Sequence, residues 1–77
     1  MSEYADSDSS IKTVLISARQ RAGLTQKELS RRTGIAQGDI SKLEHGNSNP
    51  SVRTLQRLAE GMGMTLRIEF VPKKAEN

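Results

Sequence analysis

The segment from residue 25 to residue 46 constrains the fold of this 77-residue chain more than any other feature. Thr25 and Glu28 have the spacing of a capping box, which predicts a helix start at this point. Gly34 then permits a sharp turn, and a further helix is expected from about residue 36 to residue 45. The pattern therefore predicts two short helices joined by a glycine turn, an arrangement that holds the second helix rigidly.

Apolar residues at helical spacing predict two more helices around this pair. The first is expected to begin after Ser10, whose side chain could cap it, and to end at Gly23. The last is expected to begin at the Pro50-Ser51 pair and to be stopped near Gly61. The apolar residues expected to form its buried stripe are Val52, Leu55, Leu58, Ala59 and Met62. The fold class is therefore all-α, with four to five helices.

After the last helix the periodicity changes from helical to alternating. Apolar side chains at positions 64, 66, 68 and 70 alternate along the chain, which predicts a strand ended by Pro72. Because a lone strand is unstable in water, we expect it to pair with a second copy about a two-fold axis at Ile68. The residues expected at this homodimer interface are Leu66, Arg67, Ile68, Glu69 and Phe70, with residue 66 opposite 70 and residue 67 opposite 69. A strand packed on its own helices, or a disordered tail, is the alternative.

The chain is thus expected to contain a disordered acidic tail (1–9), a helical domain (10–63), a dimerisation strand (64–72) and a flexible tail (73–77). Twelve lysines and arginines face nine acidic residues, for a net charge of +3. Three of the acidic residues lie in the first nine positions, so the rest of the chain is clearly basic. A basic surface attracts polyanions, although charge alone also fits mere solubility.

Composition argues against several classes of function. The chain has no cysteine and a single histidine, His45, and it shows no paired-carboxylate or phosphate-loop motif. We therefore expect no enzyme, no metal site and no cofactor, and no small-molecule effector because no effector domain is visible. No apolar run approaches the ~18 residues that span a bilayer, and no signal peptide is apparent, so a cytoplasmic protein without a membrane partner is expected.

The predicted second helix of the pair has a polar face whose chemistry suits DNA bases. Glutamine matches the donor and acceptor of adenine, lysine the acceptors of guanine, and aspartate the amino group of cytosine, while a glycine lets the backbone approach closely. The candidate base-contacting residues are Gln37, Gly38, Asp39, Ser41 and Lys42. An amphipathic helix needs a polar face in any case, so a plain solvated surface is the alternative.

A second polar set surrounds this face. The free amides at the start of the first helix of the pair, and the loop after its second helix, suit phosphate oxygens. The candidate phosphate-contacting residues are Thr25, Gln26, Lys27, His45, Asn47, Asn49, Ser51 and Arg53. Ordinary cap and loop chemistry is the alternative for each of them.

Taken together, residues 15–59 resemble the helix-turn-helix domain of the lambda repressor and Cro class, the XRE family. The resemblance covers about three-fifths of the chain. The residues that carry it are Arg19, Leu24, Thr25, Gln26, Glu28, Leu29, Gly34, Ile35, Ile40, Ser41, Leu43, Glu44, Gly46, Pro50, Ser51, Thr54 and Leu55. It implies a dimeric repressor that binds a palindromic double-stranded operator through two copies of one helix.

The resemblance also assigns roles to individual residues. It implies a phosphate contact for Gln26 and a largely buried salt bridge between Arg19 and Glu44. The residues implied to face base edges are Gln37, Gly38 and Lys42, with Asp39 close to the DNA. Two positions depart from the family pattern: Ser30 replaces a common alanine, and Ala36 stands where a Ser or Thr usually caps the recognition helix. The second departure should weaken that helix start by about 1 kcal/mol.

The segment 64–72 is similar to the end of short antitoxins of the HigA and HipB type, in which a terminal strand often completes the dimer. This similarity implies an antitoxin that represses its own operon and neutralises a co-encoded toxin. A phage Cro-like repressor or a restriction-modification controller without a toxin is the alternative within the DNA-binding class. A protein-interaction module that binds no DNA is the alternative from another class.

Overall fold

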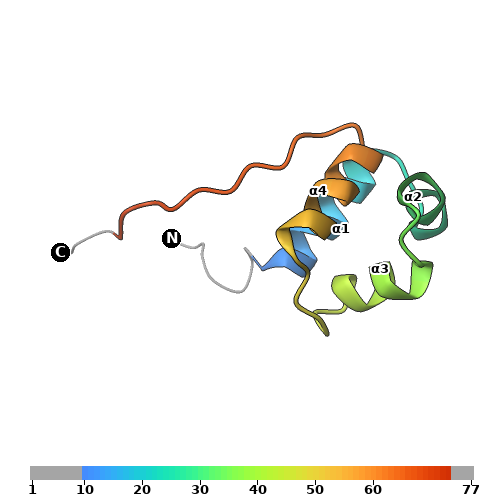
Figure 1. Ribbon diagram of the computed structural model, residues 1–77, viewed down its shortest axis with the longest axis horizontal. Helices are drawn as coiled ribbons and strands as arrows, with labels where there is room; N and C mark the ends of the chain where they lie inside the picture. Colours follow the sequence, from blue (N-terminus) through green and yellow to red (C-terminus); the bar gives the residue numbers. More distant parts are fainter. Residues whose placement is uncertain (1–9, 74–77) are drawn as a thin grey trace.

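The computed structural model describes residues 10–73, and four helices account for most of that range (Figure 1). They are α1 (Ile11–Arg21), α2 (Gln26–Thr33), α3 (Gln37–Glu44) and α4 (Val52–Gly61). Helix α3 packs on α1 and α2, and α4 packs on α2. The prediction of an all-helical fold is confirmed.

One hydrophobic core joins the four helices. Its members come from every helix and from the α2–α3 turn, and they are Leu15, Leu29, Ile35, Ile40, Leu43 and Leu58. Leu29, Ile40 and Leu58, one from each of the last three helices, are almost completely buried. Burying each such side chain contributes roughly 1.5–3 kcal/mol, so these residues fix how α2, α3 and α4 pack together.

The capping box predicted at the start of α2 is present. The backbone N–H of Glu28 donates to Thr25 Oγ1 at 3.0 Å, and the backbone N–H of Thr25 donates to Glu28 Oε1 at 2.8 Å. The bond from the Thr25 backbone lowers the pKa of Glu28 below its ordinary value. At the other end of α2, Gly34 adopts φ 77°, the left-handed conformation that the tight turn requires.

Three expectations about the helices need correction. The Ser10 side chain does not cap α1, because its hydroxyl lies 3.4 Å from the Thr13 hydroxyl and bonds to no helix N–H. Helix α3 is shorter by one residue at each end than expected; Ala36 offers no side-chain oxygen to cap it, and His45 already lies beyond its last residue. Val52 is 52% exposed, because it lies in the first turn of α4, at the end opposite the α2 contact.

Helices α2 and α4 meet through contacts that the sequence pattern did not reveal. Arg57 Nη2 donates to the carbonyl oxygen of Thr33 at 2.7 Å, and Arg32 Nη1 donates to that of Gly61 at 3.3 Å. Each helix thus supplies an arginine to the last carbonyl of the other. Gly61 also lets the helices approach closely, since a Cβ atom there would overlap Thr33 Cγ2 and lie 3.3 Å from Leu29 Cδ1.

Residues 64–73 leave the end of α4 and run away from α2 and α3 (Figure 1). They form neither a helix nor a strand within the described part of the chain. Arg67 Nε lies 2.9 Å from Glu69 Oε2 of the same chain, and both side chains are largely exposed. Pairing of this segment with a second copy stays a prediction, and the predicted tails at 1–9 and 74–77 lie outside the described residues.

Candidate DNA-binding surface

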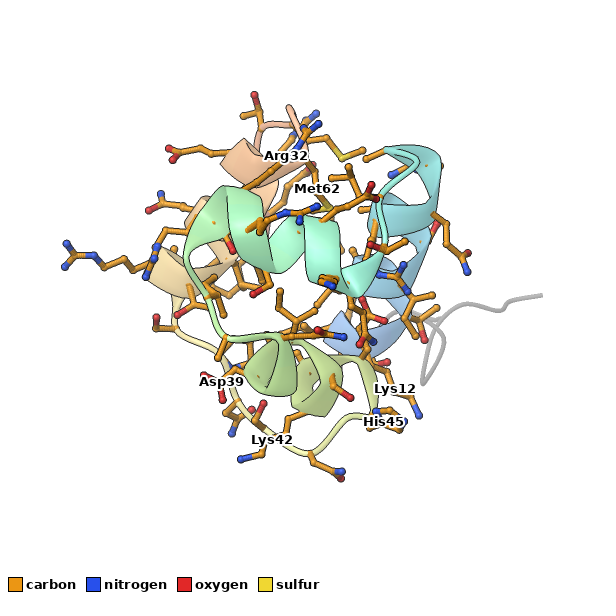
Figure 2. All side chains as sticks on the ribbon, turned by 90° about the vertical axis from the view of Figure 1, so that its right-hand side faces the viewer. Lys12, Arg32, Asp39, Lys42, His45 and Met62 are labelled. Carbon is orange, nitrogen blue, oxygen red and sulfur yellow. The ribbon has the colours of Figure 1, made fainter. Side chains whose placement is uncertain are left out.

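Helix α3 presents to solvent the face that the sequence singled out. Its opposite face is buried through Ile40, Leu43 and Glu44. The exposed members of the candidate base-contacting set are Gln37, Gly38, Asp39 and Lys42, and Ser41 is half-buried. Figure 2 shows Asp39 and Lys42 at the outer edge of the molecule, away from Arg32 and Met62. The helix therefore offers a continuous polar surface backed by a rigid core.

A bidentate ion pair fixes the inner side of α3. Arg19 Nε lies 2.6 Å from Glu44 Oε2, and Arg19 Nη2 donates to Glu44 Oε1 at 2.9 Å. The Arg19 and Glu44 side chains are only 16% and 4% exposed. Arg19 Nη1 also donates to the Leu24 carbonyl at 2.9 Å, so one guanidinium connects α1, the α1–α2 turn and α3. Paired donors of this kind hold a carboxylate in one orientation.

Gln26 is tied to the same carboxylate. Its Nε2 donates to Glu44 Oε1 at 3.0 Å, and its side chain is half-buried. An amide nitrogen carries two hydrogens, so one remains for a further acceptor such as a phosphate oxygen. The structure therefore positions Gln26 through Glu44 at the first turn of α2, where helix N–H groups are also free.

The remaining candidate phosphate-contacting residues lie on two segments. Thr25 and Lys27 are exposed at the start of α2, and the others follow α3: His45, Asn47, Asn49, Ser51 and Arg53, all exposed. Three of them already have intramolecular partners, the first being Thr25, whose hydroxyl accepts from the Glu28 N–H at 3.0 Å. The Ser51 hydroxyl caps α4 by accepting from the Thr54 N–H at 3.1 Å, and His45 Nδ1 lies 2.7 Å from the Ser41 carbonyl oxygen.

The structure adds Lys12, which the sequence reasoning did not select. Its Cδ would lie 3.1 Å from a Cβ built on Gly46, and it lines one shallow depression together with His45 and Asn49. Figure 2 shows Lys12 beside His45, on the same edge as Lys42. Nothing in the local pattern of α1 marks this lysine, because its neighbours at the end of α3 are more than thirty positions later in the chain.

The ion pair predicts a specific dependence of stability on pH. Burial by itself would raise the pKa of Glu44, but the hydrogen bonds from Arg19 and Gln26 and the charge of Arg19 outweigh it, so the pKa lies below its ordinary value. A lowered pKa in the folded state stabilises the fold above the unfolded pKa of about 4.3, and this stabilisation is lost as the pH falls through the folded value.

We therefore expect the difference in unfolding free energy between the wild type and Glu44→Gln to be largest near neutral pH and to shrink below about pH 4. Urea denaturation at a series of pH values from 7 to 3 measures it. A difference that stays constant over this range would show that the Glu44 carboxylate is not held in its charged form by its neighbours.

Comparison with known proteins places this arrangement in a family. The helix-turn-helix family matches residues 15–68 of the chain. The chain belongs to this helix-turn-helix family. An uncharacterized HTH-type transcriptional regulator of Haemophilus influenzae is 40% identical over 63 residues, which cover 82% of this chain and 62% of that protein. The chain thus spans less than two-thirds of that relative. The resemblance found in the sequence is confirmed.

Other relatives have different names but share the same domain. An uncharacterized HTH-type transcriptional regulator of Sinorhizobium fredii is 45% identical over 53 residues, covering 69% of this chain and 68% of that protein. Antitoxin HigA1 of Mycobacterium tuberculosis is 37% identical over 54 residues, covering 70% of this chain and 36% of that protein. The chain is thus similar both to proteins named as transcriptional regulators and to one named as an antitoxin.

The fold itself matches a solved structure. A restriction-modification controller protein, solved as a tetramer with its natural 35 base-pair operator, superposes with a TM-score of 0.68. The match covers 71% of this chain and 72% of that one, at 22% sequence identity. This likeness confirms the lambda-repressor-like helical fold. Within residues 10–73, no helix has the length and apolar character needed to cross a membrane.

Proposed function

We propose that this protein is a sequence-specific regulator of transcription that binds double-stranded DNA as a homodimer. The observation that carries the proposal is the rigid presentation of α3: its polar face is exposed while Glu44, on its inner face, is locked by Arg19. A helix held in this way enters the major groove without first being ordered, so little conformational entropy is lost on binding. The relatives named as HTH-type transcriptional regulators support this assignment.

In this proposal the two polar sets have separate tasks. Gln37, Gly38 and Lys42 approach the base edges, with Asp39 and Ser41 beside them, and so carry sequence specificity. The residues proposed to position the protein on the phosphates are Thr25, Gln26, Lys27, His45, Asn47, Asn49, Ser51 and Arg53, and we add Lys12 because it lies beside His45. Repression then follows from occupying the promoter.

A two-fold dimer would set two copies of α3 in successive major grooves, about 34 Å apart, on a palindromic operator. We further propose that the protein is the antitoxin of a toxin–antitoxin pair. Its similarity to antitoxin HigA1 supports this role. The alternative is a controller or repressor that binds DNA but has no toxin partner. Co-expression with the neighbouring reading frame distinguishes the two: an antitoxin forms a stable complex with its product and relieves its toxicity.

The DNA-binding proposal predicts a clear result for Lys42→Ala. Losing a base-reading lysine should weaken binding to the operator by about 1–3 kcal/mol and relax specificity at one position. The measurement is a titration of DNA from upstream of the protein's own gene, at two salt concentrations, with random duplex as the competitor. Lys73→Ala is the matched control, since it removes the same charge from the exposed tail. Equal binding by both variants, or a wild type without preference for the upstream DNA, would overturn the proposal.

Gly38→Ala should separate stability from function. A Cβ at Gly38 meets nothing within 4 Å, and the residue lies inside α3, so alanine should stabilise the fold by roughly 0.5–1 kcal/mol. The same methyl group should weaken operator binding, because it faces the DNA. Thermal denaturation and the DNA titration, done on one sample, test both halves. A variant with increased stability and unchanged binding would remove Gly38 from the proposed interface.

A further inference from the structure

An apolar groove lies between α1, α4 and the first part of the C-terminal segment, on residues that the DNA-binding proposal does not use. It has a volume of about 520 Å³. Its lining includes Val14 and Ala18 from α1, Met62 at the end of α4, and Leu66 and Ile68 from the segment. An enclosed apolar cavity of about 150 Å³ binds benzene, so this groove has room for an aromatic ring.

The aromatic residue that could fill this groove does not line it in the same chain. Phe70 is fully exposed and is not among the residues that line the groove. No glycine, asparagine or aspartate occurs between residues 64 and 71, so the alternating segment has no residue that favours a reversing turn. Phe70 therefore has no simple route back into the groove of its own chain.

We propose that Phe70 of each chain inserts into the groove between α1 and α4 of a second copy. The inference rests on the proposed homodimer and adds what holds that dimer together. An antiparallel pairing centred on Ile68 places Phe70 of one copy opposite Leu66 of the other, and residues opposite each other lie on the same face of the ribbon. Leu66 lines the groove, so the partner's ring arrives on the face that covers it.

The symmetry of this arrangement supports a second copy rather than another protein. The same contact is made twice about one two-fold axis, as an isologous interface requires. The same register sets Arg67 of one copy opposite Glu69 of the other, on the outer face of the ribbon. In the single chain these two side chains contact each other at 2.9 Å, in an exposed ion pair. Apolar and charged positions of the segment are therefore both self-complementary.

Phe70→Trp tests this inference, because the chain contains no other tryptophan. Tryptophan emission shifts to shorter wavelength when the ring leaves water, and burial also protects it from quenching by acrylamide. We expect the emission of Phe70→Trp to shift as the protein concentration rises, in step with dimer formation measured by sedimentation equilibrium. Val71→Trp is the matched control: residue 71 lies on the other face of the ribbon, so its emission should stay that of an exposed ring.

Two substitutions test the groove and the ring separately. Phe70→Ala should raise the dissociation constant of the dimer by about a hundredfold, since two rings are lost per dimer. Val14→Lys, at a half-exposed groove position, should abolish the concentration-dependent shift of Phe70→Trp without unfolding the helices, as circular dichroism would verify.

The other outcomes would overturn the inference. An emission shift that is independent of concentration would place the ring in its own chain's groove, and a shift that needs a different added protein would make the groove a heterologous site. A dimer with an exposed tryptophan would locate the interface elsewhere while leaving the proposed DNA-binding function intact. A monomer at every concentration would remove both the inference and the proposed dimer.

Discussion

Replacing Glu44 with alanine is expected to lower the free energy of unfolding by about 3–5 kcal/mol. The Arg19 side chain is only 16% exposed in the wild type, and the substitution removes the carboxylate that binds its Nε and Nη2. It also removes the acceptor of the Gln26 amide. Small domains are stable by only about 5–15 kcal/mol, so a loss of this size removes a large part of the total.

Urea denaturation followed by circular dichroism measures this loss. Glu60→Ala is the matched control: it removes the same charge from an exposed position on α4 and should change the unfolding free energy by no more than about 0.5 kcal/mol. The double variant Arg19→Met, Glu44→Leu should recover much of the loss, because no unpaired charge remains buried. If Glu44→Ala unfolds at the same urea concentration as Glu60→Ala, the ion pair does not stabilise α3.

The parts of the fold that the sequence predicts well are those decided by neighbouring residues. The capping box of Thr25 and Glu28 and the left-handed Gly34 both depend on a few consecutive positions, and both are present in the structure. The approximate ends expected for α3 are each off by one residue, and the expected burial of Val52 is wrong, because both depend on where the packing of other helices stops. Local signals specify that a helix exists more reliably than how far its buried face extends.

In the candidate site, too, the features set by neighbouring residues are predicted and the contacts between distant residues are not. The polar face of α3 follows from helical periodicity, and the structure exposes most of it. The link between Arg19 and Glu44 joins residues 25 positions apart, so only the family resemblance could suggest it. Lys12 reaches the end of α3 across a similar separation and carried no signal at all. Contacts between distant positions become visible only once the helices are packed.

The close approach of α2 and α4 gives the second large effect. Gly61→Ala is expected to lower the free energy of unfolding by up to about 3 kcal/mol, the upper end for added volume in a packed core. The new Cβ would overlap Thr33 Cγ2 and crowd Leu29, which is fully buried. Separating the helices to relieve the overlap would lengthen the bonds from Arg57 to Thr33 and from Arg32 to Gly61.

A double-mutant cycle identifies the methyl group responsible. Thr33→Ser removes Cγ2 but keeps the hydroxyl that donates to the Leu29 carbonyl at 2.8 Å, so it should restore part of the stability that Gly61→Ala loses. Gly38→Ala is the control for replacing a helical glycine by alanine, since a Cβ added at residue 38 meets nothing within 4 Å. If the two effects at residues 33 and 61 simply add, the loss does not come from this contact. A favourable coupling would instead show that Gly61, the last residue of α4, also sets the distance between α4 and α2. Because α3 packs on α2, this distance then also affects how α3 is positioned.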